Sequence, residues 1–369
     1  GPTVFTYAGP LHNQIPRPLS AADPSGDMIW TPDFSPAYYS NIIFGAGTAF
    51  SYTRQDGSAV SEDFRGRSVA DYYADLSGGR YAIRGDIIGW VKLTNSIWWY
   101  GADPAPGARS VPSGVSCAHH GGIPGAGNAR SLVIDALEAV KARHPFFNWW
   151  RYDQDGDGVI DRLWIIHAGL GEEDKAALLN RTPYGEAALW SHSSSLSPYY
   201  EIASGVFAGP YIMMPENCGI GVLAHEYGHN LGADDLYAYD AGDTSAGFWT
   251  LMADDWTGYP IGYLPPAVDP WHLDTWGWLD SAVIADPARV YEIALGQASA
   301  FPGGVGLRRG ARIDLPDQSV VLPVQPTGSY QWWGGAVDQA NARMTQKQAV
   351  AIPPAGASLT FRTAYDLEA

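Results

Sequence analysis

The sequence predicts an α+β fold over residues 1–286, followed by an all-β segment over residues 287–369. Three stretches of helical period and several short apolar runs occupy the first part, whereas the second carries only short runs typical of strands. The 43 glycines and 27 prolines, with only 17% charged residues, indicate a loop-rich globular protein rather than a helical bundle. A length of 369 residues fits one large domain or two ordinary ones.

Helices in the first part are predicted from capping residues and apolar spacing. Ser68 begins a helix that ends at the glycine pair 78–79, and apolar residues at helical spacing predict a second helix over residues 129–143. A third helix over residues 219–231 ends at Gly232. Apolar runs predict strands at residues 81–93, 163–166 and 211–214.

The sequence pattern changes after about Pro287, where the second part begins. Short runs typical of strands occur at residues 290–293, 319–322 and 358–361. The chain stops just after the last of these runs, so we expect a truncated, jelly-roll-like β-sandwich over residues 287–369.

Composition disfavours two classes of protein. The formal net charge of -17 is opposite to the basic face of a nucleic-acid binder, and no apolar stretch approaches the roughly 20 residues of a membrane-spanning helix. An acidic balance suits a soluble, secreted protein that binds cations. In a secreted chain the two cysteines, Cys117 and Cys218, predict one disulfide bond, with two buried thiols as the alternative.

The pattern His225-Glu226-Tyr227-Gly228-His229 lies in the third predicted helix. Two histidines four residues apart share one face of a helix, so both imidazoles can reach one metal ion. Glu226 lies beside them, where it can take a proton from a water activated by the metal. This spacing is typical of zinc peptidases, and two ordinary histidines are the alternative for so short a motif.

The third protein ligand has to come from elsewhere in the chain. No glutamate lies between Glu226 and Glu292, which argues against a ligand glutamate on a later helix. Gly232 can end the helix in a left-handed conformation and turn the chain back toward the metal, which favours Asp235, three residues later, as the third ligand. Competing candidates for this role are Asp234 and, more weakly, His272.

A methionine further downstream, Met252, lies in the run of residues 247–253. Its spacing from the motif fits the tight methionine turn that lies beneath the zinc ion in metzincins. A methionine that simply fills the core is the alternative.

Residues 153–161, called the acidic loop below, are similar to a calcium-binding loop. Aspartates at alternate positions supply oxygen ligands, and Gly158 permits the sharp turn. The twelfth position is Trp164 instead of a glutamate, so the loop is no EF-hand, and a solvated acidic turn is the alternative. Mutual repulsion of the carboxylates favours a bound cation. The predicted structural calcium ligands are Asp153, Asp155, Asp157, Val159 and Asp161, with Glu172 or Glu173 completing the coordination.

With these motifs the chain resembles the M6 family of metallopeptidases, which includes bacterial immune inhibitor A. The match runs from His225 through Asp235 and Met252 to residues 271–279, and it covers most of residues 1–285. The resemblance implies a metzincin-like endopeptidase that is secreted, is made as a zymogen, and has structural calcium and a β-rich region after the catalytic domain. Further matching blocks are residues 71–73, 152–158, 167–173, 190–192 and 215–217.

These residues predict a monomeric zinc metallopeptidase that hydrolyses peptide bonds of protein or peptide substrates. Zinc held by His225, His229 and Asp235 would activate water and polarise the scissile carbonyl. Glu226 would then move the proton to the leaving amine. Candidate donors to the tetrahedral oxyanion are Tyr259, Tyr237 and His192.

Two other functions stay open on the sequence alone. One is a calcium-stabilised binding or adhesion protein with an inactive peptidase fold, and the intact Glu226 and both histidines argue against it. The other is a zinc hydrolase of a non-peptide bond. The match to the peptidase family far beyond the zinc-binding helix argues against that second alternative.

Overall fold

The structure is a computed structural model of the chain. It describes residues 9–20, 29–45, 49–63, 66–101, 127–173, 188–237, 246–253, 265–286, 289–297 and 307–315. The chain divides into two compact units, Gly1–Ile313 and Asp314–Ala369, and all the elements below belong to the first. In the part of the chain that the structure describes, no helix has the length and apolar character needed to cross a membrane.

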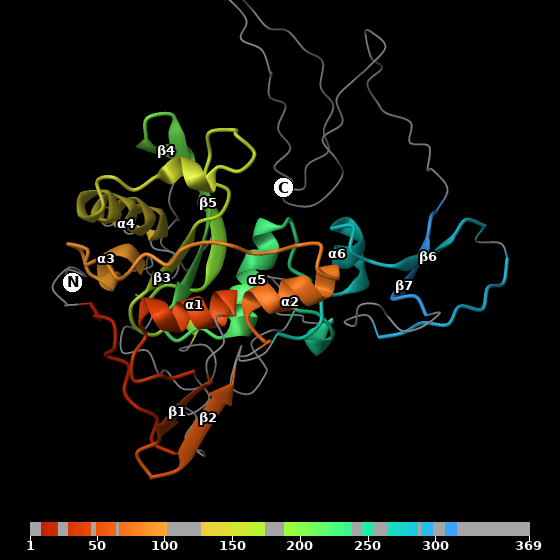
Figure 1. The fold of residues 1–369 in the computed structure, drawn as a ribbon, viewed down its shortest axis with the longest axis horizontal. Coiled ribbons are helices and arrows are strands. Elements are labelled where there is room, and N and C mark those ends of the chain that lie inside the picture. The colour runs from red at the N-terminus through yellow and green to blue at the C-terminus, as the bar shows by residue number, and fades with distance from the viewer. Residues whose placement is uncertain are drawn as a thin grey trace, which may run out of the picture. The chain divides into compact units, whose positions relative to one another are not determined.

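A three-stranded mixed sheet forms the centre of the first unit (Figure 1). Its strands are β3 (Trp164–His167), β4 (His192–Ala203) and β5 (Val206–Pro215), in the order β3-β5-β4. β5 pairs in parallel with β3 and antiparallel with β4. As the middle strand, β5 is buried along most of its length, as expected for a nearly continuous apolar run.

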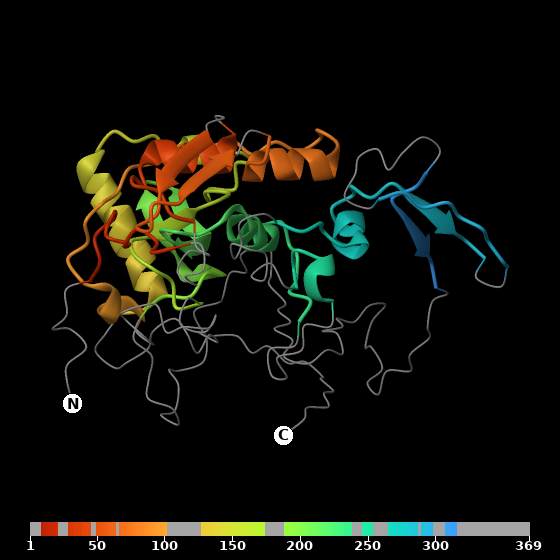
Figure 2. The same cartoon turned by 90° about the horizontal axis from the view of Figure 1, so that it is seen from below.

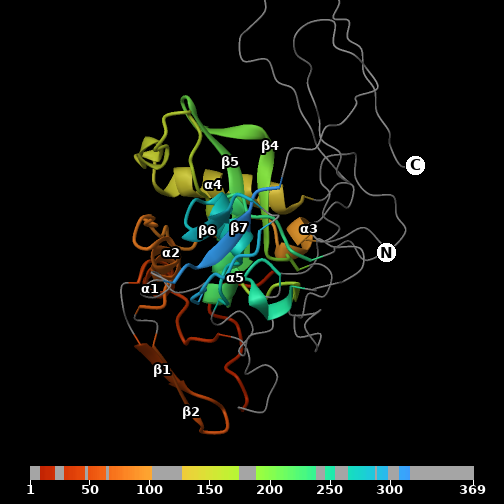
Figure 3. The same cartoon turned by 90° about the vertical axis from the view of Figure 1, so that its right-hand side faces the viewer.

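Helices cover both faces of this sheet. In chain order they are α1 (Pro36–Phe44), α2 (Val69–Ser77), α3 (Ile97–Gly101), α4 (Ala129–Arg143) and α5 (Ile220–Asn230). Side chains of β5 alternate between the two faces: Ile212 and Met214 join one hydrophobic cluster with α1, α2 and α5, while Tyr211 and Met213 join another with α3 and α4. Figure 3 shows α1 and α2 on one side of the sheet and α3 on the other. The predicted mixed α and β fold is confirmed.

The capping residues define the helices as the sequence predicts. Ser68 begins α2 with a capping box, in which Ser68 Oγ accepts from the amide of Asp71 and the Asp71 carboxylate accepts from the amide of Ser68, both at 3.0 Å. The helix ends at Gly78, whose φ is 65°. Asn128 caps α4, which has the predicted bounds. α1 and α2 lie nearly end to end and contact α5 (Figures 1 and 2).

The remaining elements surround this core. They are the hairpin strands β1 (Ala49–Thr53) and β2 (Ala59–Asp63), the 3-10 helices η3 (Trp149–Tyr152) and η6 (Gly247–Trp249), helix α6 (Pro270–Thr275), and the parallel pair β6 (Ser281–Ile284) and β7 (Gly310–Ile313). The β1–β2 hairpin projects from the body of the unit (Figures 1 and 3).

The strand predicted over residues 81–93 is wrong, because this segment forms neither helix nor strand. Its side chains nevertheless pack on both sides. Ile87 and Trp90 contact the cluster that contains α5, and Ile88 and Val91 contact the cluster that contains α4. The apolar alternation therefore reflects burial between two clusters rather than pairing with a neighbouring strand.

The strand predicted over residues 290–293 is also wrong. This segment forms no strand, and Val290 and Tyr291 are exposed, so within the described residues the apolar run is not part of a sheet. The two later runs lie outside the described residues, so the jelly-roll-like segment stays a prediction. β6 pairs with β7 across the predicted boundary at residue 286, and the division into a catalytic domain and a β-rich segment stays a prediction as well.

Candidate metal centre

Helix α5 carries the two histidines and the glutamate of the motif, as predicted. It begins after Gly219 and presents its apolar residues to the sheet and to α2. His225 and Glu226 are each only 2% exposed, and His229 is half-buried. Polar side chains at such depth need partners, because burying an unpaired charge is costly.

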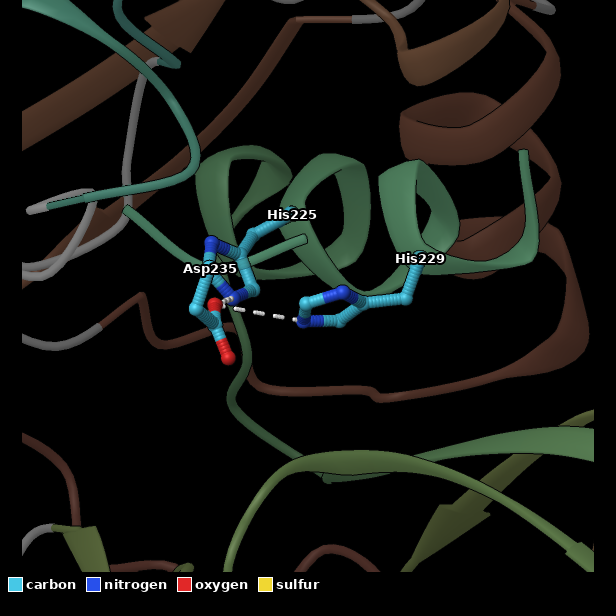
Figure 4. A group of neighbouring side chains, drawn as sticks. All are labelled: His225, His229 and Asp235. Carbon is cyan, nitrogen blue, oxygen red and sulfur yellow. Dashed lines mark ion pairs between the residues drawn. The ribbon is translucent and has the colours of Figure 1, made fainter. Parts of the chain in front are cut away.

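Gly232 ends α5 and turns the chain back toward it. Its φ is 86°, in the left-handed region that glycine adopts at no steric cost. The amide of Gly232 donates to His229 O at 2.9 Å, and the amide of Ala233 donates to Gly228 O at 3.0 Å. This pair of bonds is the Schellman C-cap. The turn brings the side chain of Asp235 alongside the helix (Figure 4).

Three potential ligand atoms meet at this point. Asp235 Oδ1 lies 3.2 Å from His225 Nε2 and 3.4 Å from His229 Nε2. Ligand atoms of the three residues all lie within 4.8 Å of one another, and Figure 4 shows both rings directed at the carboxylate. We call this group the His–Asp cluster. Two imidazoles and one carboxylate are donor types that zinc takes, and three protein ligands leave a position open, as in catalytic zinc sites.

The other ring nitrogen of each histidine is held by a backbone carbonyl. His225 Nδ1 lies 2.8 Å from Leu251 O, and His229 Nδ1 lies 2.8 Å from Ala233 O. Since a carbonyl oxygen can only accept a hydrogen bond, both rings carry N–H at Nδ1, and Nε2, which faces Asp235, is the atom that has to be free of a proton when a metal ion binds. Such second partners fix the tautomer and the ring orientation of metal ligands. The residues present therefore fit a zinc ion.

The protonation of the cluster follows from burial and proximity. Burial alone would raise the pKa of Asp235, but its hydrogen bonds with His225 and His229 outweigh burial and hold the pKa well below its usual range. Despite its own burial, His229 has a raised pKa because Asp235 accepts its hydrogen bond. Burial raises the pKa of Glu226, against the opposing effect of the two histidines. Glu226 Oε2 has no hydrogen-bond partner within the described residues.

Met252 lies directly beneath α5. Its side chain is fully buried, and a Cβ atom placed on Gly228 would lie 2.9 Å from Met252 Sδ. The amide of Leu236 donates to Met252 O at 2.7 Å, which ties the turn to the segment that carries Asp235. Met252 thus contacts α5 through its side chain and the segment that carries Asp235 through its backbone carbonyl.

Competing candidates for the third ligand lie outside the cluster. Asp234 is exposed, and its amide donates to His272 Nε2 at 3.1 Å. His272 is 1% exposed, and this bond occupies its Nε2. Neither residue belongs to the group of ligand atoms around His225, which favours Asp235.

The candidate oxyanion donors differ in position. Tyr237 follows Asp235 by two residues and is half-buried. His192 lies in β4 with Nδ1 2.8 Å from Trp190 O and Nε2 3.2 Å from the Tyr211 hydroxyl, so both of its nitrogens are engaged. Tyr259 lies outside the described residues.

Three carboxylates of the acidic loop also come together. Ligand atoms of Asp153, Asp155 and Asp157 lie within 4.8 Å of one another. The loop's own amides already bond to them: Gly156, Asp157 and Gly158 donate to Asp153 at 2.8–3.1 Å, and Val159 donates to Asp157 at 2.7 Å. Asp161 accepts from the amide of Gln154 at 2.7 Å.

Glu172 and Glu173 do not join these aspartates, contrary to the prediction. The acidic loop precedes β3 and the glutamates follow it, so the strand, at about 3.3 Å per residue, separates them. Both glutamates are buried, and the Glu173 carboxylate accepts from Ser191 Oγ at 2.6 Å. If the loop binds a cation, water or backbone oxygens have to complete its shell.

The predicted disulfide finds no support. Cys218 is buried as a free thiol, and burial raises its pKa. Cys117 lies outside the described residues. The disulfide therefore stays a prediction.

A hydrogen-bonded group next to the cluster is not among the predicted site residues. Thr250, Asp269 and His272 are linked to one another and to the amide of Asp234. A signal was available: Asp269 followed by Pro270 predicts the start of a helix, and that helix places His272.

Comparison with known proteins gives a consistent picture. Residues 5–277 match the family model described as immune inhibitor A peptidase M6, catalytic domain. The chain is 28% identical over 364 residues to the pre-pro-metalloprotease PrtV of Vibrio cholerae serotype O1, covering 89% of this chain and 36% of that protein. It is 26% identical over 406 residues to immune inhibitor A of Bacillus thuringiensis subsp. alesti, covering 99% of this chain and 53% of that protein. The chain thus spans about a third to a half of these relatives.

Proposed function

The chain belongs to the M6 family of immune inhibitor A-like peptidases, as its motifs predict, and on this premise we propose that it is a secreted, zinc-dependent endopeptidase of protein substrates. The observation that carries the proposal is the convergence of His225, His229 and Asp235. Family membership supports a metallopeptidase, and the donor set supports zinc as its metal.

In this proposal His225 Nε2, His229 Nε2 and Asp235 Oδ1 hold the zinc ion. Bound zinc supplies Lewis-acid chemistry: it lowers the pKa of a water and polarises the scissile carbonyl. The carbonyls of Leu251 and Ala233 keep the two rings oriented, so the ligands are arranged before the ion arrives.

Glu226 is the proposed general base and acid. A carboxylate oxygen of Glu226 takes a proton from the attacking water and delivers it to the leaving amine. Its burial at 2% exposure excludes competing bulk water, and a base with a raised pKa suits proton exchange closer to neutral pH. Tyr237 and Tyr259 remain candidates for the oxyanion donor, while His192 is disfavoured because both of its ring nitrogens are engaged.

Two further features belong to the proposal. The acidic loop is proposed as a calcium site that stabilises the edge of the sheet, supported by the approach of Asp153, Asp155 and Asp157. Secretion as a zymogen is supported by the relative described as a pre-pro-metalloprotease.

Digestion of a denatured proteome, read by mass spectrometry, tests the function. The wild-type protein should cut it, a zinc chelator should stop cutting, and Glu226→Gln should bind zinc but lose about 10²- to 10⁴-fold in rate. Glu292→Gln, at an exposed site, removes the same charge and should cut normally. A zinc-loaded wild-type protein that cuts nothing would sink the proposal in favour of a binding protein or a hydrolase of another bond. Cutting that survives zinc removal would sink it in favour of a different catalyst.

A further inference from the structure

His272 is a buried histidine whose two ring nitrogens both have partners. It lies on α6, is 1% exposed, and has Nδ1 2.7 Å from Asp269 Oδ2. Its Nε2 accepts from the amide of Asp234 at 3.1 Å. An acceptor nitrogen carries no proton, so the ring is neutral and its one N–H is at Nδ1, donated to the carboxylate.

Asp269 is itself held from two sides. It caps α6, with Oδ1 accepting from the amide of His272 at 3.0 Å. Its Oδ2 also accepts from Thr250 Oγ1 at 2.7 Å. Thr250 Oγ1 in turn accepts from the amide of Met252 at 3.3 Å. A continuous chain of hydrogen bonds therefore runs from the methionine turn to the residue that precedes Asp235.

The segment that bears Asp235 needs such support. It follows Gly232, whose left-handed turn fixes where the chain goes only if the residues after it are held. Trp276 Nε1 donates to Leu231 O at 2.9 Å, before the turn. The amide of Leu236 donates to Met252 O, after it. The bond from Asp234 to His272 lies between these two and is adjacent in sequence to the ligand carboxylate.

We propose that His272 is a positioning residue that fixes Asp235 as the third zinc ligand. It acts through the backbone of Asp234, while Asp269 and Thr250 hold its ring in place. The role rests on the proposed zinc site and adds to it a support that spans 38 residues of sequence. His272, a weak candidate ligand on sequence alone, thus acts on the metal site indirectly, through the amide of Asp234.

Two substitutions of His272, by amide side chains of similar size, test the roles of its two ring nitrogens separately. His272→Gln places an amide oxygen near the position of Nε2, where it can accept from Asp234, but it loses the bond to Asp269. His272→Asn places an amide nitrogen near the position of Nδ1, where it can donate to Asp269, but it does not reach Asp234. Zinc affinity is measured by competition with a chromophoric chelator, and the visible spectrum of the cobalt-substituted protein reports ligand geometry.

We expect His272→Asn to bind zinc about 10- to 100-fold more weakly, as for loss of other outer-sphere partners, and to shift the cobalt spectrum. His272→Gln should stay close to the wild-type protein in both. Thermal unfolding of the metal-free proteins serves as the control for packing. If both variants bind zinc as tightly as the wild-type protein, the positioning role of His272 is overturned. It is also overturned if both variants lose the same amount of zinc affinity and this loss parallels their loss of stability. A wild-type protein that binds no zinc would overturn the proposed function itself, whereas intact wild-type binding with unaffected variants overturns only the role of His272.

Discussion

The His–Asp cluster and the acidic loop each bring three potential metal ligands within 4.8 Å of one another, but different parts of the chain hold them. The partner of His225 in the cluster is 26 residues away, and the partner of Asp234, the neighbour of Asp235, is 38 residues away. In the acidic loop, every hydrogen bond to an aspartate that the described residues make comes from an amide within seven residues. In the cluster His225 is buried and the other two residues are half-buried, whereas Asp155 and Asp157 are exposed.

This difference shows that ligand types and spacing do not by themselves make two sites alike. The fold imposes the geometry of the cluster, and the geometry should persist without metal because helix, turn and α6 all converge on it. The acidic loop folds around its own carboxylates, and a cation would compete with the loop amides for the same oxygens. We therefore expect a rigid, preorganised site in the first case and a weaker, adaptable one in the second.

The largest expected effect comes from exchanging a single ligand carboxylate. Asp235→Asn should weaken zinc binding by more than the about 10- to 100-fold that the loss of an outer-sphere partner costs. Asp155→Asn, the same change in the acidic loop, should leave zinc affinity unaltered. Chelator competition measures both. If Asp234→Asn weakens zinc binding instead, the third ligand has been assigned to the wrong carboxylate.

The next largest effect concerns the packing of Met252 against α5. Gly228→Ala would place a methyl group 2.9 Å from Met252 Sδ, and such overpacking costs about 1–3 kcal/mol of stability. Gly156→Ala in the acidic loop meets no atom within 4 Å, and its φ of 75° leaves only backbone strain of about 1–2 kcal/mol. Chemical denaturation should show both losses, with zinc affinity falling only in Gly228→Ala. Unchanged zinc affinity in that variant would contradict the idea that Met252 supports the cluster.

A pH series tests two buried histidines outside the cluster, His167 and His192. Burial lowers the pKa of His167 and His192 to about 4, whereas unfolded histidine titrates near 6.5. Between these values the unfolded chain binds more protons, so stability is full above pH 6.5 and falls as the pH drops toward 4. The loss between pH 7 and pH 5 is about 2 kcal/mol for each histidine. Urea unfolding of His192→Gln should show a shallower slope over this range, and an identical slope would refute the assignment.

The smallest effect concerns calcium in the acidic loop. Calcium at about ten times its dissociation constant should stabilise the fold by about 1.4 kcal/mol. A calcium-selective chelator should therefore lower the melting temperature by a few degrees, and Asp155→Asn should abolish this response. If the wild-type protein melts at the same temperature with and without calcium, the loop is an ordinary solvated turn.

The sequence predicts the ligands better than it predicts their supports. His225, His229 and Asp235 lie in one helix and the turn after it, so residue spacing alone brings them together. The residues behind them, such as Thr250 and His272, meet only after distant segments close, and no local pattern encodes that closure.

The same distinction explains the fold predictions. The residues at the helix ends and the apolar spacing predict α2, α4 and α5 correctly. Helices α1 and α6 are not among the predicted elements, although Ser35-Pro36 is a start signal for α1 and Asp269-Pro270 is one for α6. The sequence does not predict β4, because its serine-rich beginning is polar, and it forms a strand because β5 supplies the partner. For residues 81–93 the opposite holds: the apolar pattern predicts a strand, but no neighbouring strand among the described residues pairs with the segment.

The Schellman turn at Gly232 also affects the conformational entropy that is lost when the site assembles. All three proposed zinc ligands come from the eleven consecutive residues 225–235, so one helix and one reversal suffice to bring them together. The contacts behind them close longer loops, and each doubling of loop length adds about 0.6 kcal/mol of entropy. The three ligands are therefore brought together at a smaller entropic cost than the supporting residues Thr250 and His272.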